Sequence, residues 1–159
     1  MAYNINDIAD YIIINQTVND KNNYLSNWKL QKLLYYIQAW SYGINQKPLF
    51  DGDFEAWIHG PVNREIYNRF ASTKNIYSEI EMNDCINKDV KIDNDDAEFI
   101  DWILKNYAKF SGFELEKLSH SEIPWIKTRD MLDPHERCDK VISPDFIQEY
   151  YGEKWEKIK

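Results

Sequence analysis

The sequence contains few of the residues that build linkers, disulfide frameworks or membrane spans. Its 159 residues include only five glycines and five prolines, which leaves no room for a long flexible linker. Cys85 and Cys138 lie far apart, without a C-x-x-C motif or histidines at zinc-finger spacing, so neither a disulfide framework nor a structural zinc site is expected. No apolar run is long enough to cross a bilayer. These absences predict one globular domain over residues 1–159, without a membrane as partner.

Basic residues are outnumbered by acidic ones. Lysine and arginine together number 19 against 27 aspartates and glutamates, which gives a formal net charge of −8. This charge argues against nucleic acid as a partner, because binding to phosphate backbones depends on basic groups that displace counterions. It is compatible with a basic protein partner and equally with solubility alone. The N-terminal segment has no basic leader and no cleavage site, so we expect a cytoplasmic protein.

What the sequence does contain is a helix signal over residues 28–42 that is apolar around most of its circumference. Such a helix is typical of the centre of a domain, with other elements packed on several sides. We expect it to begin at Ser26 or Asn27 as its N-cap. It should end near Tyr42, with Gly43 as a left-handed cap. Its apolar residues are Leu30, Leu33, Leu34, Tyr35, Tyr36, Ile37, Ala39, Trp40 and Tyr42.

Two short strands are expected beside this helix. Residues 54–58 are aromatic, partly alternating and bounded by Gly52 and Gly60, and Val141-Ile142 is a second strand signal. We predict that residues 54–58 pair with residues 140–143. Gly60-Pro61 then predicts the start of a new helix, because proline suits the first helical turn. The fold class is therefore α+β and mostly helical, with a central apolar helix and a small two-stranded β element.

The remaining segments predict further helices. A first helix capped by Asn4 or Asn6 precedes a polar loop over 18–23, and residues 72–92 predict an irregular loop with at most one short strand. Asp93 or Asn94 caps a strongly periodic helix that is broken at Gly112. Three later helices are expected, over 114–119, after Ser121 as an N-cap, and over 145–151 behind Pro144.

Two groups of residues have the chemistry of a site. Asp51, Asp53 and Glu55 alternate as cation ligands do, but the spacing of a calcium loop is missing, so we expect a solvated turn and no metal. Glu55 with His59 or His120 suggests an acid–base group, and with it a small hydrolase or transferase. No nucleophile motif accompanies these residues. The structural interpretation, in which Glu55 accepts hydrogen bonds from residues such as Lys29, Gln31 or Lys32, is favoured over catalysis.

The order of several short blocks resembles a known family. The blocks are KLQKLLYY (29–36), KPLF (47–50), FEAW (54–57) and GPV (60–62), followed by Leu118, His120, Pro124 and Trp125. Together they resemble the Panacea domain of SocA-like antitoxins and phage-associated proteins, over a motif-bearing core of about residues 8–150. The motif residues, which serve either the fold or partner binding, are Lys29, Gln31, Lys32, Tyr36, Glu55, Trp57, Gly60, Pro61, His120, Pro124 and Trp125.

The resemblance implies an antitoxin of a bacterial or phage toxin–antitoxin pair, with a cognate toxin protein as its partner. Family members neutralise very different toxins, in general by binding the toxin directly. The founding member instead acts as an adaptor that delivers its toxin to an ATP-dependent protease, so sequestration and proteolysis both stay open. The resemblance implies neither an enzymatic activity nor a cofactor.

Overall fold

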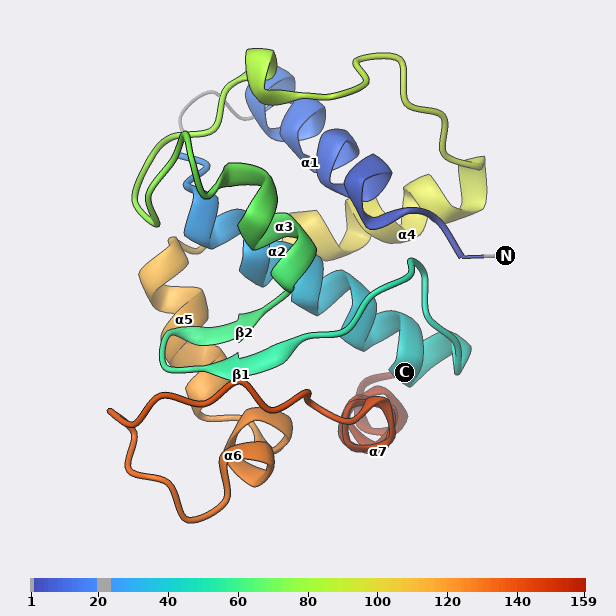
Figure 1. Ribbon diagram of the computed structural model, residues 1–159. Coiled ribbons are helices and arrows are strands. Elements are labelled where there is room, and N and C mark those ends of the chain that lie inside the picture. The colour runs from blue at the N-terminus through green and yellow to red at the C-terminus, as the bar shows by residue number, and fades with distance from the viewer. Residues whose placement is uncertain (1, 20–23) are drawn as a thin grey trace.

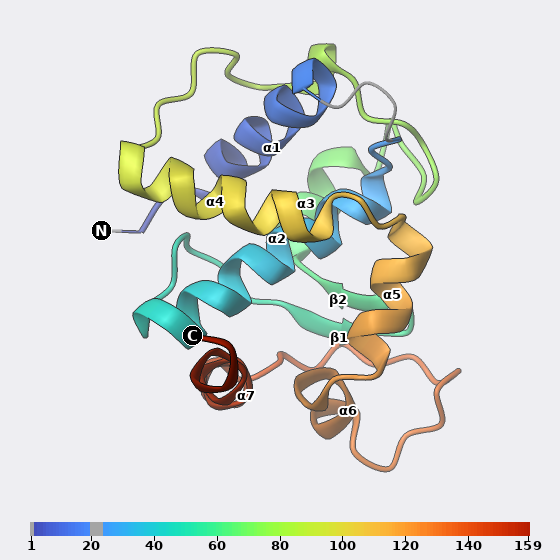
Figure 2. The same ribbon diagram turned by 180° about the vertical axis from the view of Figure 1, so that it is seen from behind.

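Helix α2 (Asn27–Trp40) crosses the middle of the molecule, and every one of its residues is buried. In the computed structural model, which describes residues 2–19 and 24–159, other elements surround α2 on all sides (Figures 1 and 2). Its N-cap is Ser26, whose side chain accepts a hydrogen bond from the backbone N–H of Lys29. The prediction of a central, buried helix beginning at this cap is confirmed.

The end of this helix differs from the prediction. After Trp40 the chain continues as a π-helix over Ser41–Asn45 (η1), and the left-handed residue is Gln46, with φ of 59°, rather than Gly43. Gly43 lies within this π-helix, where the chain passes close to the backbone of Tyr151. A Cβ atom there would lie 2.7 Å from the backbone carbon of Tyr151. Glycine is therefore needed for packing against the C-terminal helix, not for a positive φ.

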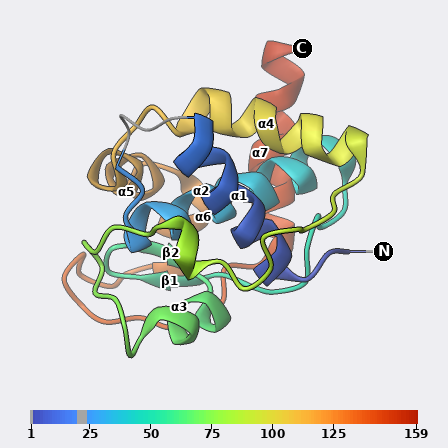
Figure 3. The same ribbon diagram turned by 90° about the horizontal axis from the view of Figure 1, so that it is seen from above.

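Two helices cover one side of α2. They are α1 (Ile5–Asn19), which lies above α2, and α4 (Asn94–Tyr107), which lies on the far side in Figure 1 and in front of α2 in Figure 2; Figure 3 shows both from above. Asn4 caps α1 through a hydrogen bond from Asn6 N, and Asp93 is the N-cap residue of α4, as expected. Residues 18 and 19, predicted as part of a loop over 18–23, belong to α1 instead, and residues 20–23 lie outside the described part of the chain.

Four further α-helices complete the described part of the structure. They are α3 (Arg64–Phe70), α5 (Gly112–His120), α6 (Ile123–Arg129) and α7 (Pro144–Ile158). The predicted break at Gly112 was wrong, because α4 already ends at Tyr107 and Gly112 opens α5 behind the N-cap Ser111. The predicted cap at Ser121 was wrong by one residue: Ser121 ends α5, and Glu122 is the N-cap of α6. None of the described helices is long and apolar enough to cross a membrane.

The β element is a hairpin, and its pairing differs from the prediction. Strands β1 (Glu55–Trp57) and β2 (Gly60–Val62) pair antiparallel, with Ala56 opposite Pro61. The predicted pairing with residues 140–143 is reduced to one bridge, Glu55 to Val141. Pro61 therefore belongs to a strand, not to a helix. Gly60, with φ of 103°, reverses the chain within this short turn.

Helix α3 begins only after the hairpin. Asn63 is its N-cap and accepts a hydrogen bond from Ile66 N. The stretch 72–92 is irregular, as expected. In its described residues it contains a short 3₁₀ helix, Met82–Asp84 (η2), and the expected strand is only a single bridge from Glu79 to Ser26.

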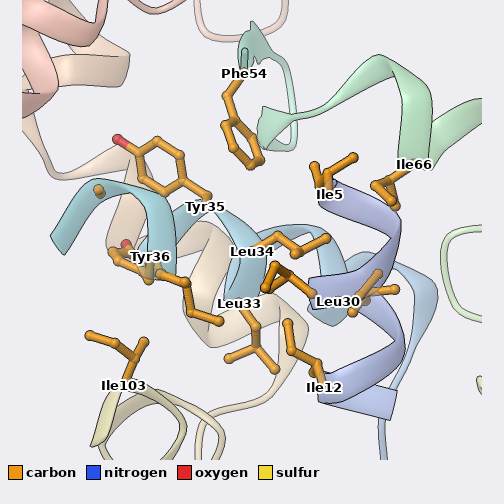
Figure 4. Close-up of a cluster of buried hydrophobic side chains, with 14 of the residues drawn as sticks. Ile5, Ile12, Leu30, Leu33, Leu34, Tyr35, Tyr36, Phe54, Ile66 and Ile103 are labelled. Atoms are coloured by element: carbon orange, nitrogen blue, oxygen red, sulfur yellow. The ribbon is translucent and has the colours of Figure 1, made fainter. Parts of the chain in front are cut away.

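One continuous apolar core holds these elements together. Side chains from α1, α2, α3 and α4 converge on it, and Phe54 reaches it from the segment before β1 (Figure 4). At roughly 25 cal/mol per Å² of buried apolar surface, this core is the main stabilising contribution. The labelled members are Ile5, Ile12, Leu30, Leu33, Leu34, Tyr35, Tyr36, Phe54, Ile66 and Ile103.

Candidate functional site

Most of the motif residues meet where the hairpin packs against α5, α6 and the N-terminal half of α2. We call this region the hairpin junction and define it by Lys32, Trp57, Gly60, His120 and Trp125. Its elements come from distant parts of the sequence and lie side by side in Figures 1 and 2. The region is therefore assembled only in the folded chain.

The polar motif side chains of α2 bind backbone groups. Gln31 Nε2 donates to the Asn63 carbonyl at 3.0 Å, and Asn63 N donates back to Gln31 Oε1 at 2.8 Å. Lys32 Nζ donates to the Pro61 carbonyl at 3.0 Å. Lys29 Nζ donates to the carbonyl of Ala108 at the end of α4. The expectation that these residues are hydrogen-bonding partners of Glu55 was wrong, because each reaches a main-chain group instead.

Lys32 is the most deeply buried of these cations. Its Nζ lies 3.8 Å from the centroid of the Trp28 ring, which supplies a cation–π contact. Burial lowers the pKa of Lys32 well below its ordinary value, and the nearby charge of Glu116 opposes this shift. Gly60 leaves room for the side chain, since a Cβ there would lie 2.7 Å from Lys32 Cε.

Glu55 lies at the outer edge of the junction. Its Oε1 accepts hydrogen bonds from Arg64 Nη2 and Trp57 Nε1, both at 2.8 Å. Partial burial raises the pKa of Glu55, but these hydrogen bonds and the Arg64 charge outweigh burial, so the net pKa is lowered. Glu55 is thus an ionised partner of Arg64, which is opposite to what a proton-donating acid requires.

The predicted acid–base group is not assembled in the described structure. His59 Nδ1 lies 3.1 Å from Glu116 Oε1, and Glu55 has no hydrogen bond to His59 or His120 among the described residues. His120 stacks on Trp125 with 4.0 Å between ring centroids. Burial lowers the pKa of His120, with Glu116 the strongest opposing contribution. Its Nε2 is buried and unpaired among the described residues, which fits a packed junction residue.

Helix α6 closes the junction from the other side. Trp125 Nε1 donates to the Trp57 carbonyl at 2.9 Å, and Pro124 occupies the first turn that directs Trp125 inward. Arg129 was not predicted. Its buried guanidinium lies over the Trp125 ring and donates to the Ala56 carbonyl at 2.9 Å. The hairpin is therefore held by α2 through Lys32 and by α6 through Arg129.

The last motif residue, Tyr36, belongs to a second region that sequence reasoning missed. Glu122 Oε1 accepts hydrogen bonds from Tyr36 and Tyr151 hydroxyls at 2.8 and 2.7 Å, and Lys154 Nζ lies 3.3 Å from Oε2. We call this set, with Tyr107 stacked on Tyr36, the Glu122 junction. Burial is the largest cause of the raised pKa values of Tyr36 and Tyr151, and Glu122 adds to it. The sequence signal that could have indicated this region is the position of Glu122, which stands just before a helix whose first turn contains proline.

An open hollow of about 460 Å³ lies next to the hairpin junction. We call it the aromatic hollow. Trp28, His59 and Glu116 line it on the junction side, where Trp28 Nε1 donates to Glu116 Oε1 at 3.1 Å. Three exposed aromatic residues stand around it, namely Tyr24 (54%), Tyr77 (72%) and Phe113 (67%). Neither these residues nor Glu116 were predicted from the sequence, because they come from separate loops and α5.

The acidic turn predicted as solvated is exposed at Asp51 and Asp53. Across residues 2–19 and 24–159, no three or more histidines, cysteines, aspartates or glutamates are grouped as metal ligands. Cys85 and Cys138 are free thiols. The hairpin junction and the Glu122 junction are held together by hydrogen bonds, aromatic packing and buried basic side chains.

Comparison with known proteins identifies relatives of this chain. The family described as "Antitoxin SocA-like, Panacea domain" matches residues 30–126, a range that includes every motif residue except Lys29. Antitoxin SocA of Caulobacter vibrioides (strain NA1000 / CB15N) is 33% identical over 138 residues, covering 77% of this chain and 72% of the relative. No solved structure matches the chain at a significant level.

Proposed function

The chain belongs to the SocA-like Panacea family of antitoxins, and from that premise we propose that it neutralises a cognate toxin by binding the toxin protein directly. The family relationship is the observation on which this proposal rests. We treat residues 1–159 as one antitoxin domain that acts in the cytoplasm. The net charge of −8 supports a basic protein, rather than nucleic acid, as the partner.

The burial of the motif residues supports a division of labour between core and surface. Lys29, Gln31 and Lys32 are buried and bonded to backbone groups: Gln31 and Lys32 hold the hairpin against α2, and Lys29 ties α2 to the end of α4. A scaffold of this kind keeps its core while its surface varies, and toxin contact then falls to exposed side chains. The exposed aromatic residues around the aromatic hollow suit this role, since tyrosine and tryptophan are enriched at energetically dominant interface positions.

Co-expression with the product of the neighbouring gene tests the proposal. We expect the chain to restore growth of cells that express that product and to co-purify with it in a stable complex. A catalytically inactive toxin variant allows the complex to be isolated when free toxin kills the host. Absence of both rescue and complex would reject the proposal.

Sequestration and delivery to a protease give different outcomes for the toxin. Under sequestration, which we propose, the toxin's half-life does not shorten when the antitoxin is present. An adaptor would instead shorten the half-life, and only in cells that contain the ATP-dependent protease. Pulse–chase measurement in wild-type and protease-deficient strains separates the two mechanisms.

We further propose that neutralisation requires no catalysis by this chain. The pairing of Glu55 with Arg64 supports this, as does the separate pairing of His59 with Glu116. Glu55→Gln should therefore leave growth rescue unchanged while the circular dichroism spectrum stays that of the parent. Loss of rescue in a folded Glu55→Gln variant would support the hydrolase or transferase alternative.

A further inference from the structure

The aromatic hollow has the size and lining of a binding site. Its volume of about 460 Å³ is within the range of roughly 300–1,000 Å³ typical of ligand pockets. Trp28 of α2 and Glu116 of α5 form its inner wall, and Tyr77 and Phe113 rise at its margin from a loop and from the first turn of α5. Aromatic rings thus surround a carboxylate.

The carboxylate of Glu116 is only half satisfied. Its Oε1 accepts hydrogen bonds from Trp28 Nε1 at 3.1 Å and lies 3.1 Å from His59 Nδ1. In the described part of the chain, Oε2 has no hydrogen bond, and no lysine or arginine forms an ion pair with Glu116. The side chain is only 17% exposed. Oε2 is not among the sealed, unpaired atoms, so it is in contact with solvent.

Lys32 and Lys29 of α2 both donate to main-chain carbonyls. Lys32 donates to the Pro61 carbonyl, and burial lowers its pKa, which weakens it as a counter-ion. Lys29 contributes its backbone near Gly112, while its Nζ donates to the Ala108 carbonyl. The inner wall therefore keeps an acidic group without an ion-paired lysine or arginine among the described residues.

The other charged residues at the margin of the hollow contact groups other than Glu116. Lys109 Nζ lies 5.4 Å from the centroid of the Phe110 ring, and Lys117 Nζ lies 5.7 Å from that of Phe113. The rings at this margin thus already attract cations of the chain itself. Glu114, the other acidic residue in the lining, accepts a hydrogen bond from Ser111 N as part of a capping box. It is therefore engaged in stabilising the start of α5.

We infer that the aromatic hollow binds an arginine side chain of the toxin, with the guanidinium stacked on its aromatic rings and donating to Glu116 Oε2. This inference rests on the proposed function, because it specifies how the toxin is recognised. Guanidinium is planar, stacks on aromatic faces and is less strongly hydrated than ammonium, so it suits a partly buried carboxylate between rings. The net charge of −8 also attracts a basic partner surface.

A test without the toxin uses N-acetyl-arginine N-methylamide as the probe. In ¹⁵N-labelled protein, the indole N–H of Trp28 reports on the hollow, because it donates to Glu116. We expect the probe to shift this signal with a dissociation constant on the order of millimolar, as befits one small cationic group. The neutral citrulline analogue should give no such shift, nor should the arginine probe with Glu116→Gln. Equal shifts from both probes, or none from either, would overturn the inference.

A second test uses the toxin identified by co-expression. Glu116→Gln keeps an oxygen that can accept from Trp28, and we expect it to weaken toxin binding by roughly tenfold or more, as loss of a charged interface partner does. Glu149→Gln on the exposed surface of α7 changes the net charge equally and should leave affinity unchanged. Unaltered affinity in Glu116→Gln would reject this inference while leaving the proposed function intact.

Tyr77→Ala provides an independent variant in case Glu116→Gln fails to fold. Its side chain is mostly exposed, so the fold should tolerate the change, and binding should weaken because one wall of the hollow is lost. If the neighbouring gene product does not bind at all, the proposed function fails, and the arginine titration still decides whether the hollow binds this side chain.

Discussion

Both halves of α2 bury polar side chains, but the two halves satisfy the hydrogen bonds of these side chains in different ways. At the hairpin junction, its N-terminal half buries Gln31 and Lys32, and their polar atoms reach backbone groups of residues 61 and 63. At the Glu122 junction, its C-terminal half buries Tyr36 and Trp40, whose polar atoms reach the side chains of Glu122 and Tyr107. One region is tied by main-chain geometry and the other by the identity of partner side chains.

This difference determines how each region responds to substitution. A backbone carbonyl is present whatever side chain its residue carries, so the hairpin junction depends on local conformation above all. The Glu122 junction depends on side-chain chemistry, because Glu122 is the shared acceptor for two tyrosine hydroxyls. We therefore expect conformational changes to damage the first region and chemical changes to damage the second.

The largest effect should come from Trp40, whose indole N–H donates to Tyr107 of the Glu122 junction. Trp40→Ala should reduce the free energy of unfolding by about 3–5 kcal/mol, because it removes a large buried ring and leaves a cavity. Urea denaturation followed by circular dichroism measures this loss. Trp102→Ala removes a neighbouring ring that is 37% exposed and should destabilise less. An equal loss in both variants would contradict the central placement of Trp40.

A conformational change should damage the hairpin junction. Gly60→Ala forces a side chain onto a residue with φ of 103° and into contact with Lys32, so we expect a loss of at least about 1–3 kcal/mol from backbone strain. Gly152→Ala is the matched control. Gly152 lies within α7, where an added Cβ has only an ordinary 3.7 Å contact, and alanine there should stabilise by about 0.5–1 kcal/mol. Thermal melting of both variants should therefore shift in opposite directions.

A chemical change should damage the Glu122 junction to a smaller extent. Glu122→Gln keeps the shape and one acceptor oxygen but removes the charge that receives two tyrosine hydroxyls and Lys154. We expect a loss of roughly 1–2 kcal/mol, the difference between charged and neutral hydrogen bonds. Tyr36→Phe, which removes one of these bonds, should lose less. If Glu122→Gln leaves the free energy of unfolding unchanged, the charge of Glu122 does not stabilise this junction.

The smallest effect concerns the pH dependence contributed by Lys32. Its pKa is lowered in the folded state, so between that pKa and the unfolded value near 10.5 the unfolded chain binds more protons. This contribution to stability therefore rises with pH across that window and is lost as pH falls through it, so none remains below the folded pKa. Lys32→Met should flatten the profile relative to wild type, with little change in stability at alkaline pH. Identical slopes in urea denaturation across pH 7–10 would contradict a lowered pKa.

Helix periodicity made much of the fold predictable. The position of α2, its Ser26 cap and the burial of Trp40 follow from local spacing and capping chemistry. The hairpin was not predictable in the same way, because Gly60-Pro61 suits a helix start as well as a strand. Only the chain reversal at Gly60, beside a buried lysine, selects the strand.

The candidate site was harder to predict than the fold. Most of the motif residues meet in the fold, but the hydrogen-bond partners predicted for them were wrong, since a backbone carbonyl such as that of Pro61 has no signature in a sequence. Glu116 and Glu122 look like ordinary surface acids when read along the chain. Their roles follow from helices that meet only in the folded molecule, which local patterns do not encode.

The buried polar side chains of α2 also bear on cooperativity. Through them, α2 is tied directly to main-chain groups at residues 49–50, 61–63 and 108, in addition to its apolar contacts. None of these three segments can detach without leaving one of these groups unpaired, so we expect amide hydrogens in α2 to exchange with solvent only through global unfolding. Native-state exchange should then give one opening energy along α2, equal to the total stability. The surfaces presented to a toxin would form and disappear together with that helix.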